Sequence, residues 1–464
     1  MKTHLTTVLA LSFIAGTWIS FDTPTPAEAQ SRLSRKRQVQ TQTVTPPTTQ
    51  TTPARDYSML KIIPPPAGGM YLGQYEWVEG DIATFEAASG RKTALWSRHR
   101  GSWGNGYDAA GQPHFDVQAA NRAWEEGKVI IVQMYNTTPT PGESEAPAEF
   151  TVDKLLSGQY DPDLRRFAAE LRQFGKPVFF TAGREPNGVE SAYFGGFGPA
   201  GDKSLLWALE NKRGFADFEP SRLPYATLYM DAGNPQVCDG VERLKAAQRY
   251  YYDFFVRREG LKFLTFDTMG WAVRQVNQIE YDLEKYPSTI DKAYARQLLQ
   301  SCHSFANFYP GDEYVDWVSL TFYMLDYYAK DFPGLTRDYV ISVDEHMRNL
   351  DKVMGEVKLV APNKPVFFME FGFPDGLSQN SSWAAQKIAT GFPRIISEYP
   401  EIKGFAMWSG HPSWMVHGVF PFDCLIRPGT SEGTALKKVV SGNPAAFRSC
   451  VYLSDGKLHP NCIN

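Results

Sequence analysis

Between residues 70 and 408, eight short apolar runs alternate with segments of helical periodicity. Most of the runs are continuous in apolar, β-branched or aromatic residues, which is typical of parallel strands buried on both faces. Eight strands that alternate with helices predict a (β/α)8 TIM barrel. A doubly wound open sheet is the alternative, and the count of eight favours the barrel. The expected strands are Met70–Tyr75, Thr93–Ser97, Val129–Tyr135, Val178–Thr181, Phe263–Thr268, Trp317–Tyr323, Val366–Glu370 and Gly404–Trp408.

Several segments between these runs carry apolar residues at helical spacing. The clearest is Pro162–Phe174, where Asp161-Pro162 is a typical helix start and Gly175 a typical helix end. Its apolar face contains Leu164, Phe167, Leu171 and Phe174. The other expected helices are Val241–Glu259, Lys292–Phe308, Val343–Met354 and Trp383–Glu398.

Two long insertions follow the third and fourth expected strands, at Asn136–Tyr160 and Gly188–Asp239. Both leave the C-terminal ends of their strands, where the active sites of α/β barrels lie. Long loops at such a position usually shape a cleft. We therefore expect a single catalytic barrel domain whose cleft is bordered by these two loops.

The N-terminal segment differs from the rest of the chain. An apolar stretch over residues 5–21 follows Lys2, and Ala27-Glu28-Ala29 fits a small-x-small cleavage site, so residues 1–29 predict a secretory signal peptide. An uncleaved anchor is the alternative. Residues 30–56 are rich in Thr, Gln and Pro and predict a disordered spacer before a domain over 57–464. The expected product is secreted or periplasmic and has no membrane contact after cleavage.

Charge and cysteine content limit the partners of the chain. The chain has a net charge of −4, whereas nucleic-acid-binding proteins usually carry an excess of positive charge. No cysteine spacing resembles a metal site, so we expect neither metal nor cofactor. Cys424, Cys450 and Cys462 lie near the C-terminus, and export permits disulfides. One bridge among these three is expected to hold the C-terminal tail.

Two expected strands each lead to a glutamate at the C-terminal end. Glu185 follows the run Val178–Thr181, and Glu370 ends the run Val366–Glu370. A carboxylate at the end of a buried strand is costly unless it is paired or used. In a closed barrel the fourth and seventh strands place both acids at one mouth, and two carboxyls in one pocket are the machinery of glycoside hydrolysis. A structural salt bridge at the barrel rim is the alternative.

Four sequence blocks, at residues 176–188, 309–318, 364–372 and 399–408, resemble those of a known group of enzymes. They are similar, in order and spacing, to the retaining barrel hydrolases that carry an acid/base Glu on strand four and a nucleophile Glu on strand seven. Within that superfamily the chain most resembles glycoside hydrolase family 26, which contains β-mannanases and mixed-linkage β-glucanases. The resemblance extends from about residue 70 to residue 414.

The resemblance implies a role for four residues. Glu370 would be the nucleophile that forms a covalent glycosyl-enzyme, and Glu185 would be the acid/base. Tyr323 would donate a hydrogen bond to Glu370 and hold its oxygen in line, although ordinary packing is an alternative for this ring. Trp408 would form the floor of the central sugar subsite.

Residue 184 departs from the family pattern. Members usually have His before the acid/base Glu, and related families have Asn, but this chain has Arg184. An Arg paired with that carboxyl would favour the charged form, which does not suit a general acid. Because adjacent strand residues point to opposite faces, Arg184 is expected to contact substrate or another acid, such as Asp267 or Asp316. The departure keeps a non-catalytic glycan-binding barrel as an alternative.

Further residues that follow the expected strands are candidates for binding sugar hydroxyls or stacking on sugar rings. They are His99, Trp103, Tyr193, Trp271 and Trp414, and loop packing is an equal alternative for each. The sequence thus predicts an exported retaining hydrolase of β-linked polysaccharide, an endo-acting β-mannanase or β-glucanase. A hydrolase or transglycosylase acting on the cell's own exopolysaccharide is a further alternative. The oligomeric state stays open.

Overall fold

The computed structural model describes residues 55–66, 68–76, 79–98, 114–134, 155–183, 239–268, 270–273, 292–293, 304–326, 337–376, 382–410 and 422–462. All of them belong to one compact unit, Arg55–Asn464. The expected signal peptide lies outside the described residues, as does the spacer up to Ala54. Arg55 already belongs to the folded unit, because its side chain pairs with Asp455. Within the described residues, no helix combines the length and the apolar character needed to cross a membrane.

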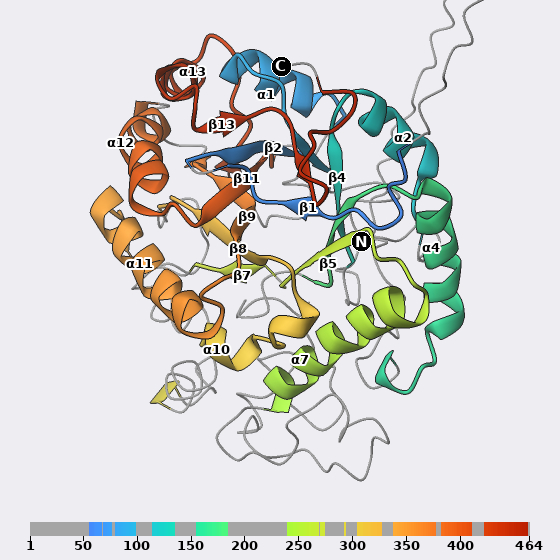
Figure 1. Cartoon of the computed structure of the whole chain (residues 1–464). Helices are drawn as coiled ribbons and strands as arrows, with labels where there is room; N and C mark the ends of the chain where they lie inside the picture. The colour runs from blue at the N-terminus through green and yellow to red at the C-terminus, as the bar shows by residue number, and fades with distance from the viewer. Residues whose placement is uncertain are drawn as a thin grey trace, which may run out of the picture. The chain divides into compact units, whose positions relative to one another are not determined.

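Eight parallel strands form a closed barrel (Figure 1). Neighbours pair in the order β6-β5-β4-β3-β2-β11-β9-β8, and a parallel bridge from Asp267 to Trp317 joins β6 to β8 and closes the ring. All eight expected strands are confirmed, with ends shifted by at most two residues. The strands are β2 (Met70–Glu76), β3 (Leu95–Arg98), β4 (Val129–Gln133), β5 (Val178–Thr181), β6 (Leu264–Asp267), β8 (Val318–Tyr323), β9 (Val366–Gly372) and β11 (Ile402–Trp408).

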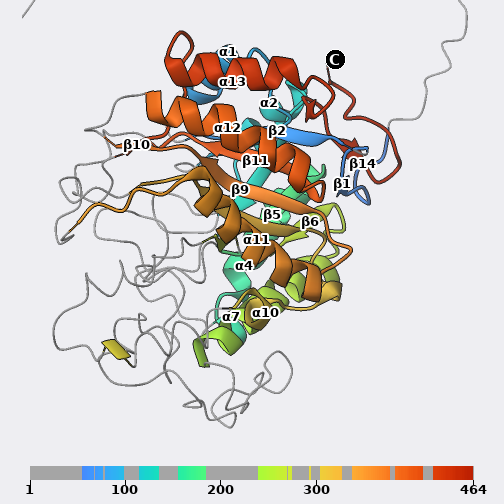
Figure 2. The same cartoon turned by 90° about the vertical axis from the view of Figure 1, so that its left-hand side faces the viewer.

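Helices cover the outside of the barrel between successive strands (Figures 1 and 2). The helix α4 (Asp161–Phe174) begins at Asp161-Pro162 and ends at Gly175, which has a φ of 61°, so the predicted start and stop are confirmed. Its buried residues include Leu164, Phe167 and Leu171. The other α-helices of the described residues are α1 (Asp81–Ser89), α2 (Val117–Glu125), α7 (Asp239–Tyr252), α10 (Phe305–Phe308), α11 (Val343–Val360), α12 (Ser382–Glu398) and α13 (Ser431–Gly442).

Aromatic rings fill the barrel interior and set two opposite strands against each other. Phe179 of β5 and Phe367 of β9 stack with ring centroids 5.3 Å apart and an interplanar angle of 10°. Trp317 packs edge-on against Phe179 at 5.2 Å. Since β5 and β9 are the fourth and seventh strands of the barrel, their C-terminal ends open onto the same mouth.

The strand β9 contains a bulge one residue before its glutamate. Phe368 pairs with Leu320 of β8, but the next pair joins Glu370 to Thr321, so β9 has one extra residue there. Phe368 and Phe371 both pack in the core between the barrel and its helices. These two outward-facing residues are three positions apart, whereas in a regular strand they would be two apart. A bulge re-aims the side chains that follow it. Strict alternation would point Glu370 outward with Phe368, and the bulge removes it from that face.

The C-terminal tail wraps the N-terminal end of the barrel. Its strand β13 (Phe447–Arg448) pairs with β2, and β14 (Tyr452–Leu453) pairs with β1 (Ile62–Ile63). In Figure 2, β1 and β14 lie at one end of the barrel and β10 (Asp375–Gly376), which follows β9, lies at the other. A disulfide joins Cys450 to Cys462, so the expected bridge in the tail is confirmed, and Cys424 takes no part in it.

Loss of this disulfide should destabilise the protein. Replacing both cysteines with Ser is expected to lower the free energy of unfolding by about 3 kcal/mol, because the bond closes a loop with a sequence separation of 12. Urea unfolding monitored by tryptophan fluorescence measures the change. The single variants Cys450→Ser and Cys462→Ser should each lose as much as the double variant. An unchanged unfolding midpoint would contradict a structural role for the bond.

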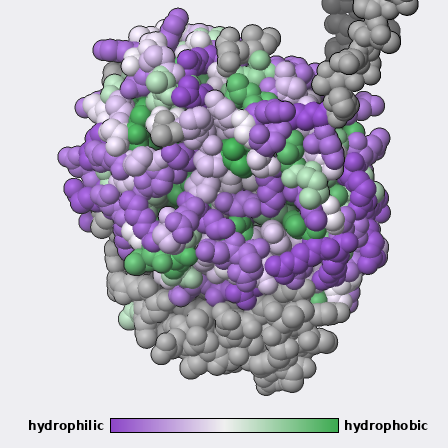
Figure 3. All heavy atoms as spheres, in the orientation of Figure 1, coloured by the Kyte–Doolittle hydropathy of each residue, from purple (hydrophilic) through white to green (hydrophobic). Residues whose placement is uncertain are grey.

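The described surface in the view of Figure 3 is mainly hydrophilic, with small separate apolar patches. The large apolar side chains most exposed among the described residues are Met59, Val340 and Leu359, which lie on three different segments. Broad apolar patches mark protein interfaces. The part of this face that the structure describes has no such patch, so it gives no reason to place a functional surface there.

Candidate active site

Glu370 lies near the C-terminal end of β9 and is 3% exposed. Its Oε2 accepts a hydrogen bond of 2.7 Å from Oη of Tyr323, the last residue of β8. The two strands are in register here, with Tyr323 opposite Gly372. A phenol that donates to a carboxylate favours its charged form and fixes one of its oxygens. Glu370 is therefore a buried and oriented carboxyl at the mouth of the barrel.

Two glycines make room for the aromatic rings beside this carboxyl. Trp408 ends β11, and its ring lies edge to face with Tyr323, with centroids 5.5 Å apart. A Cβ on Gly410 would lie 2.2 Å from Cη2 of Trp408, and a Cβ on Gly372 would lie 2.9 Å from Cδ1 of Tyr323. Neither distance is sterically possible without movement. The positions of both rings thus depend on glycine at 372 and 410.

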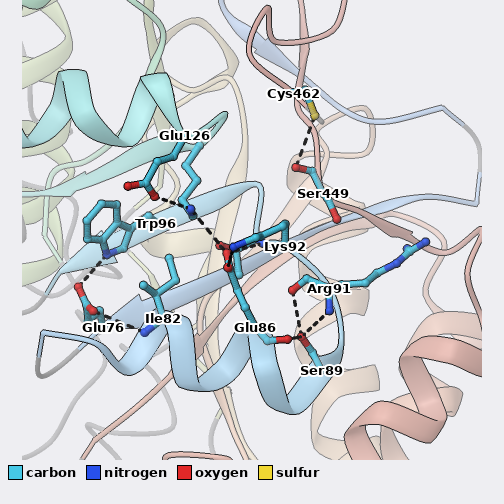
Figure 4. Close-up of polar contacts among 12 residues, drawn as sticks. Glu76, Ile82, Glu86, Ser89, Arg91, Lys92, Trp96, Glu126, Ser449 and Cys462 are labelled. Atoms are coloured by element: carbon cyan, nitrogen blue, oxygen red, sulfur yellow. Dashed lines mark hydrogen bonds and ion pairs between the residues drawn. The ribbon is translucent and has the colours of Figure 1, made fainter. Parts of the chain in front are cut away.

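A second strand-end glutamate, Glu76 of β2, has a structural role. Its Oε1 accepts from the backbone N–H of Gly80 at 2.8 Å. Its Oε2 accepts from Nε1 of Trp96 at 3.0 Å (Figure 4). These contacts lie at the start of α1, on the outer side of the barrel. Acidic groups stabilise helix N-termini. Glu86 of α1 is also structural, since it pairs with Lys92 at 2.6 Å (Figure 4).

A buried acid, Asp267, lies at the end of β6 inside the barrel. Its Oδ1 accepts a hydrogen bond of 2.5 Å from Oγ1 of Thr181, the last residue of β5. Burial raises the pKa of Asp267 well above its usual range. A neutral acid suits this apolar interior, and its contact with Thr181 links β6 to the strand that leads to Glu185.

Two expectations from the sequence need correction. Asp316 does not lie at the mouth, because it precedes β8 at the opposite end and pairs there with Nζ of Lys61 at 2.7 Å. Trp271 does not face a sugar site, because its ring packs edge-on against Phe305 and Phe308 of α10.

The other predicted site residues lie outside the described part of the chain. They are Glu185, Arg184, His99, Trp103, Tyr193 and Trp414. Glu185 follows Thr181, the last residue of β5, by four positions in the sequence. The strand that leads to it faces β9 through the stacked rings of Phe179 and Phe367. The structure thus brings together Glu370, Tyr323 and Trp408 of the predicted set.

A cleft of about 730 Å³ lies at the opposite end of the barrel. Its lining includes Lys262, Trp317 and Pro365, which lie one or two residues before the strands β6, β8 and β9. In α/β barrels this end contributes to stability, whereas active sites lie at the C-terminal ends of the strands. We therefore assign the candidate site to the mouth beside Glu370. In the described ranges no group of three metal-ligating side chains gathers.

Comparisons with known proteins give likenesses to solved structures alone. No family model matches the chain, and no curated protein matches it. A Cellulomonas fimi endo-β-1,4-mannanase double mutant is similar at 12% identity and a TM-score of 0.48, over 82% of this chain and 73% of that one. The catalytic domain of a Bacillus sp. GH26 endo-β-1,4-mannanase is similar at 13% identity and a TM-score of 0.44, over 81% of this chain and 86% of that one. GH26C from Muricauda sp. is similar at 12% identity and a TM-score of 0.44, over 80% of this chain and 85% of that one.

Proposed function

We propose that this protein is an exported retaining glycoside hydrolase that cleaves β-linked polysaccharide of the mannan or glucan type. One observation carries the proposal. Glu370 is a buried carboxyl oriented by Tyr323 at the end of the seventh barrel strand, and the fourth strand opposite leads to a second glutamate, Glu185. Two carboxyls at one mouth are what retaining hydrolysis requires.

In the proposed reaction the two glutamates have different tasks. An oxygen of Glu370 attacks the anomeric carbon, the glycosidic C–O bond breaks, and Glu185 gives its proton to the departing oxygen. Glu185 then takes a proton from water, whose oxygen displaces Glu370 from the sugar. Tyr323 donates to Oε2 of Glu370 at 2.7 Å and so fixes the orientation of the attacking carboxylate.

The neighbouring ring supplies the proposed sugar contact. Trp408 lies against Tyr323 at the end of β11, and flat indole faces stack on sugar rings. Such a ring beside the nucleophile would form the floor of the central subsite. The expected mode of attack is endo, with export directed by residues 1–29.

A polysaccharide panel tests the function. Glu185→Gln should lower hydrolysis of mannan or β-glucan by on the order of 1,000-fold, because a positioned proton donor contributes that much. The same change should have a far smaller effect on formation of the glycosyl-enzyme from an aryl glycoside with a good leaving group. The phenolate oxygen of such a substrate leaves without needing a proton from Glu185. Reducing-end release and burst kinetics measure the two effects, and NMR of the first product reads its anomeric configuration. Inverted configuration, or equal losses on both substrates, would refute the assignment.

Arg184 in place of the family's His favours a second candidate, a glycan-binding barrel without catalysis. That protein would retain glycan in affinity electrophoresis and release no new reducing ends after long incubation. Including the cell's own exopolysaccharide in the panel distinguishes a third candidate, a hydrolase or transglycosylase of that polymer, by its products.

A further inference from the structure

A lysine is buried behind the candidate site, on the outer side of the barrel. Lys387 of α12 is 3% exposed, and its Nζ donates to Oδ1 of Asp326 at 3.1 Å and to the carbonyl oxygen of Met324 at 3.2 Å. A third contact of 3.1 Å joins Nζ to Nε2 of His346 in α11. The ammonium also lies 3.5 Å from the ring centroid of Trp383. We call this group the Lys387 cluster.

The donors of the buried ammonium are matched by acceptors in the cluster. An ammonium has three N–H donors, and Asp326, Met324 and His346 supply three acceptors. Burial and the charge of Lys387 lower the pKa of His346 to about 2, so the imidazole is neutral and its Nε2 accepts. Asp326 supplies the counter-charge and also accepts from the backbone N–H of Ile341 at 2.8 Å.

A contribution to folding stability does not by itself explain why the Lys387 cluster is buried. Replacing a buried ion pair with apolar residues of similar volume is often neutral or stabilising, because desolvation of the charges offsets their attraction. Buried pairs are best attested where they fix one arrangement of the chain. The arrangement fixed here is the segment that leaves β8, since Met324 and Asp326 follow its last residue by one and three positions.

That segment is joined directly to both residues of the proposed nucleophile pair. Met324 is the neighbour of Tyr323, and its backbone N–H donates to the carbonyl oxygen of Gly372 at 3.0 Å. Gly372 in turn follows Glu370 by two residues. The side chain of Met324 packs on Gly391, one turn after Lys387 in α12, where an added Cβ would lie 2.7 Å from its Sδ.

We propose that Lys387 is a positioning residue for the Tyr323–Glu370 pair: by holding the carbonyl of Met324 it fixes the end of β8, and thereby the phenol that orients Glu370. This inference rests on the proposed function of Glu370. It assigns no contact between Lys387 and substrate, and it explains why a charged pair is buried directly behind the mouth.

A double-mutant cycle tests the proposal by kinetics. Lys387→Met should lower kcat by roughly tenfold with KM changed less than twofold, since small misplacements at a reacting group cost up to about 100-fold. In a Tyr323→Phe background the same change should cost less than about twofold, because the phenol through which it acts is gone. Equal losses in both backgrounds would overturn the proposal.

Lys364→Met is the matched control. Lys364 also donates to two backbone carbonyls, those of Asp312 at 2.8 Å and Val315 at 2.6 Å, but it does so before β8 begins. Its loss should lower the melting temperature without changing kcat. If Lys387→Met fails to fold, the pair Asp326→Asn and Lys387→Met removes both charges together and carries the same predictions. A kcat loss in the control as large as that of the test variant would contradict positioning.

A spectroscopic readout separates this proposal from the proposed function. The protein is labelled with 3-fluorotyrosine, and the ¹⁹F resonance of Tyr323 is assigned by its loss in Tyr323→Phe. Lys387→Met should shift or broaden that resonance, whereas Lys364→Met should leave it in place. An unchanged resonance in Lys387→Met overturns the positioning role. If the wild type turns over no substrate, the proposed function is overturned. The ¹⁹F resonance still reports whether Lys387 positions Tyr323.

Discussion

Replacing Glu370 with Gln is expected to lower kcat on mannan or β-glucan by on the order of 10⁴-fold, while the protein stays folded. The amide keeps the shape of the side chain, and its oxygen can still accept from Tyr323 Oη, which lies 2.7 Å from Oε2. It lacks the negative charge needed to attack an anomeric carbon, so covalent catalysis stops. Reducing-end assays measure the loss, and circular dichroism checks the fold.

Glu76→Gln is the matched control for this variant. Glu76 is also a buried glutamate at a strand end, but it accepts from Gly80 and Trp96 on the outer side of the barrel. Weakening its contacts at the start of α1 should cost about 1 kcal/mol of unfolding free energy and leave kcat unchanged. If the two glutamine variants had equal activity, Glu370 would be no more than another structural acid.

Gly410→Ala is expected to lower kcat/KM by roughly 100-fold, because the added methyl displaces Trp408 and with it the proposed sugar floor. The new Cβ would lie 2.2 Å from Cη2 and 2.5 Å from Cζ2 of that ring, so the indole must move. Overpacking of this kind also costs about 1–3 kcal/mol of stability. Steady-state kinetics on oligosaccharides and thermal unfolding measure the two effects.

Gly355→Ala controls for the substitution itself. Gly355 lies within α11, and a Cβ there meets no atom within 4 Å. Alanine should raise stability by about 0.5–1 kcal/mol, since glycine weakens a helix interior, and activity should not change. Normal kcat/KM in Gly410→Ala, with an intact fold, would show that Trp408 does not form the subsite.

The barrel could be predicted from sequence because its strands are short, continuous apolar runs. Val178–Thr181 illustrates this, since all of its residues are buried and its bounds match the expected run. Helix α4 was equally readable, because Pro162 and Gly175 mark its two ends. Helix α1 was not among the expected helices, because polar residues such as Asp81 and Glu86 are buried along with Phe85, which removes an apolar stripe.

The sequence suggests residues for the candidate site, but it does not give the geometry in which Glu370 and Tyr323 meet. Alternation along β9 would have turned Glu370 outward, and only the bulge seen in the pairing with β8 explains its contact with Tyr323. The position of Trp271 after the fifth strand does not reveal that its ring packs against α10. The Lys387 cluster escaped notice because its members come from three segments that the sequence does not relate.

Trapping the covalent intermediate tests the central claim most directly. A 2-deoxy-2-fluoro glycoside with a good leaving group should form a glycosyl-enzyme that hydrolyses slowly, because the fluorine destabilises both transition states. Mass spectrometry of the digested protein is expected to find one added glycosyl residue, on Glu370 within the peptide that spans 366–372. A label on another residue, or none while the substrate is hydrolysed, would contradict the assignment of Glu370 as the nucleophile.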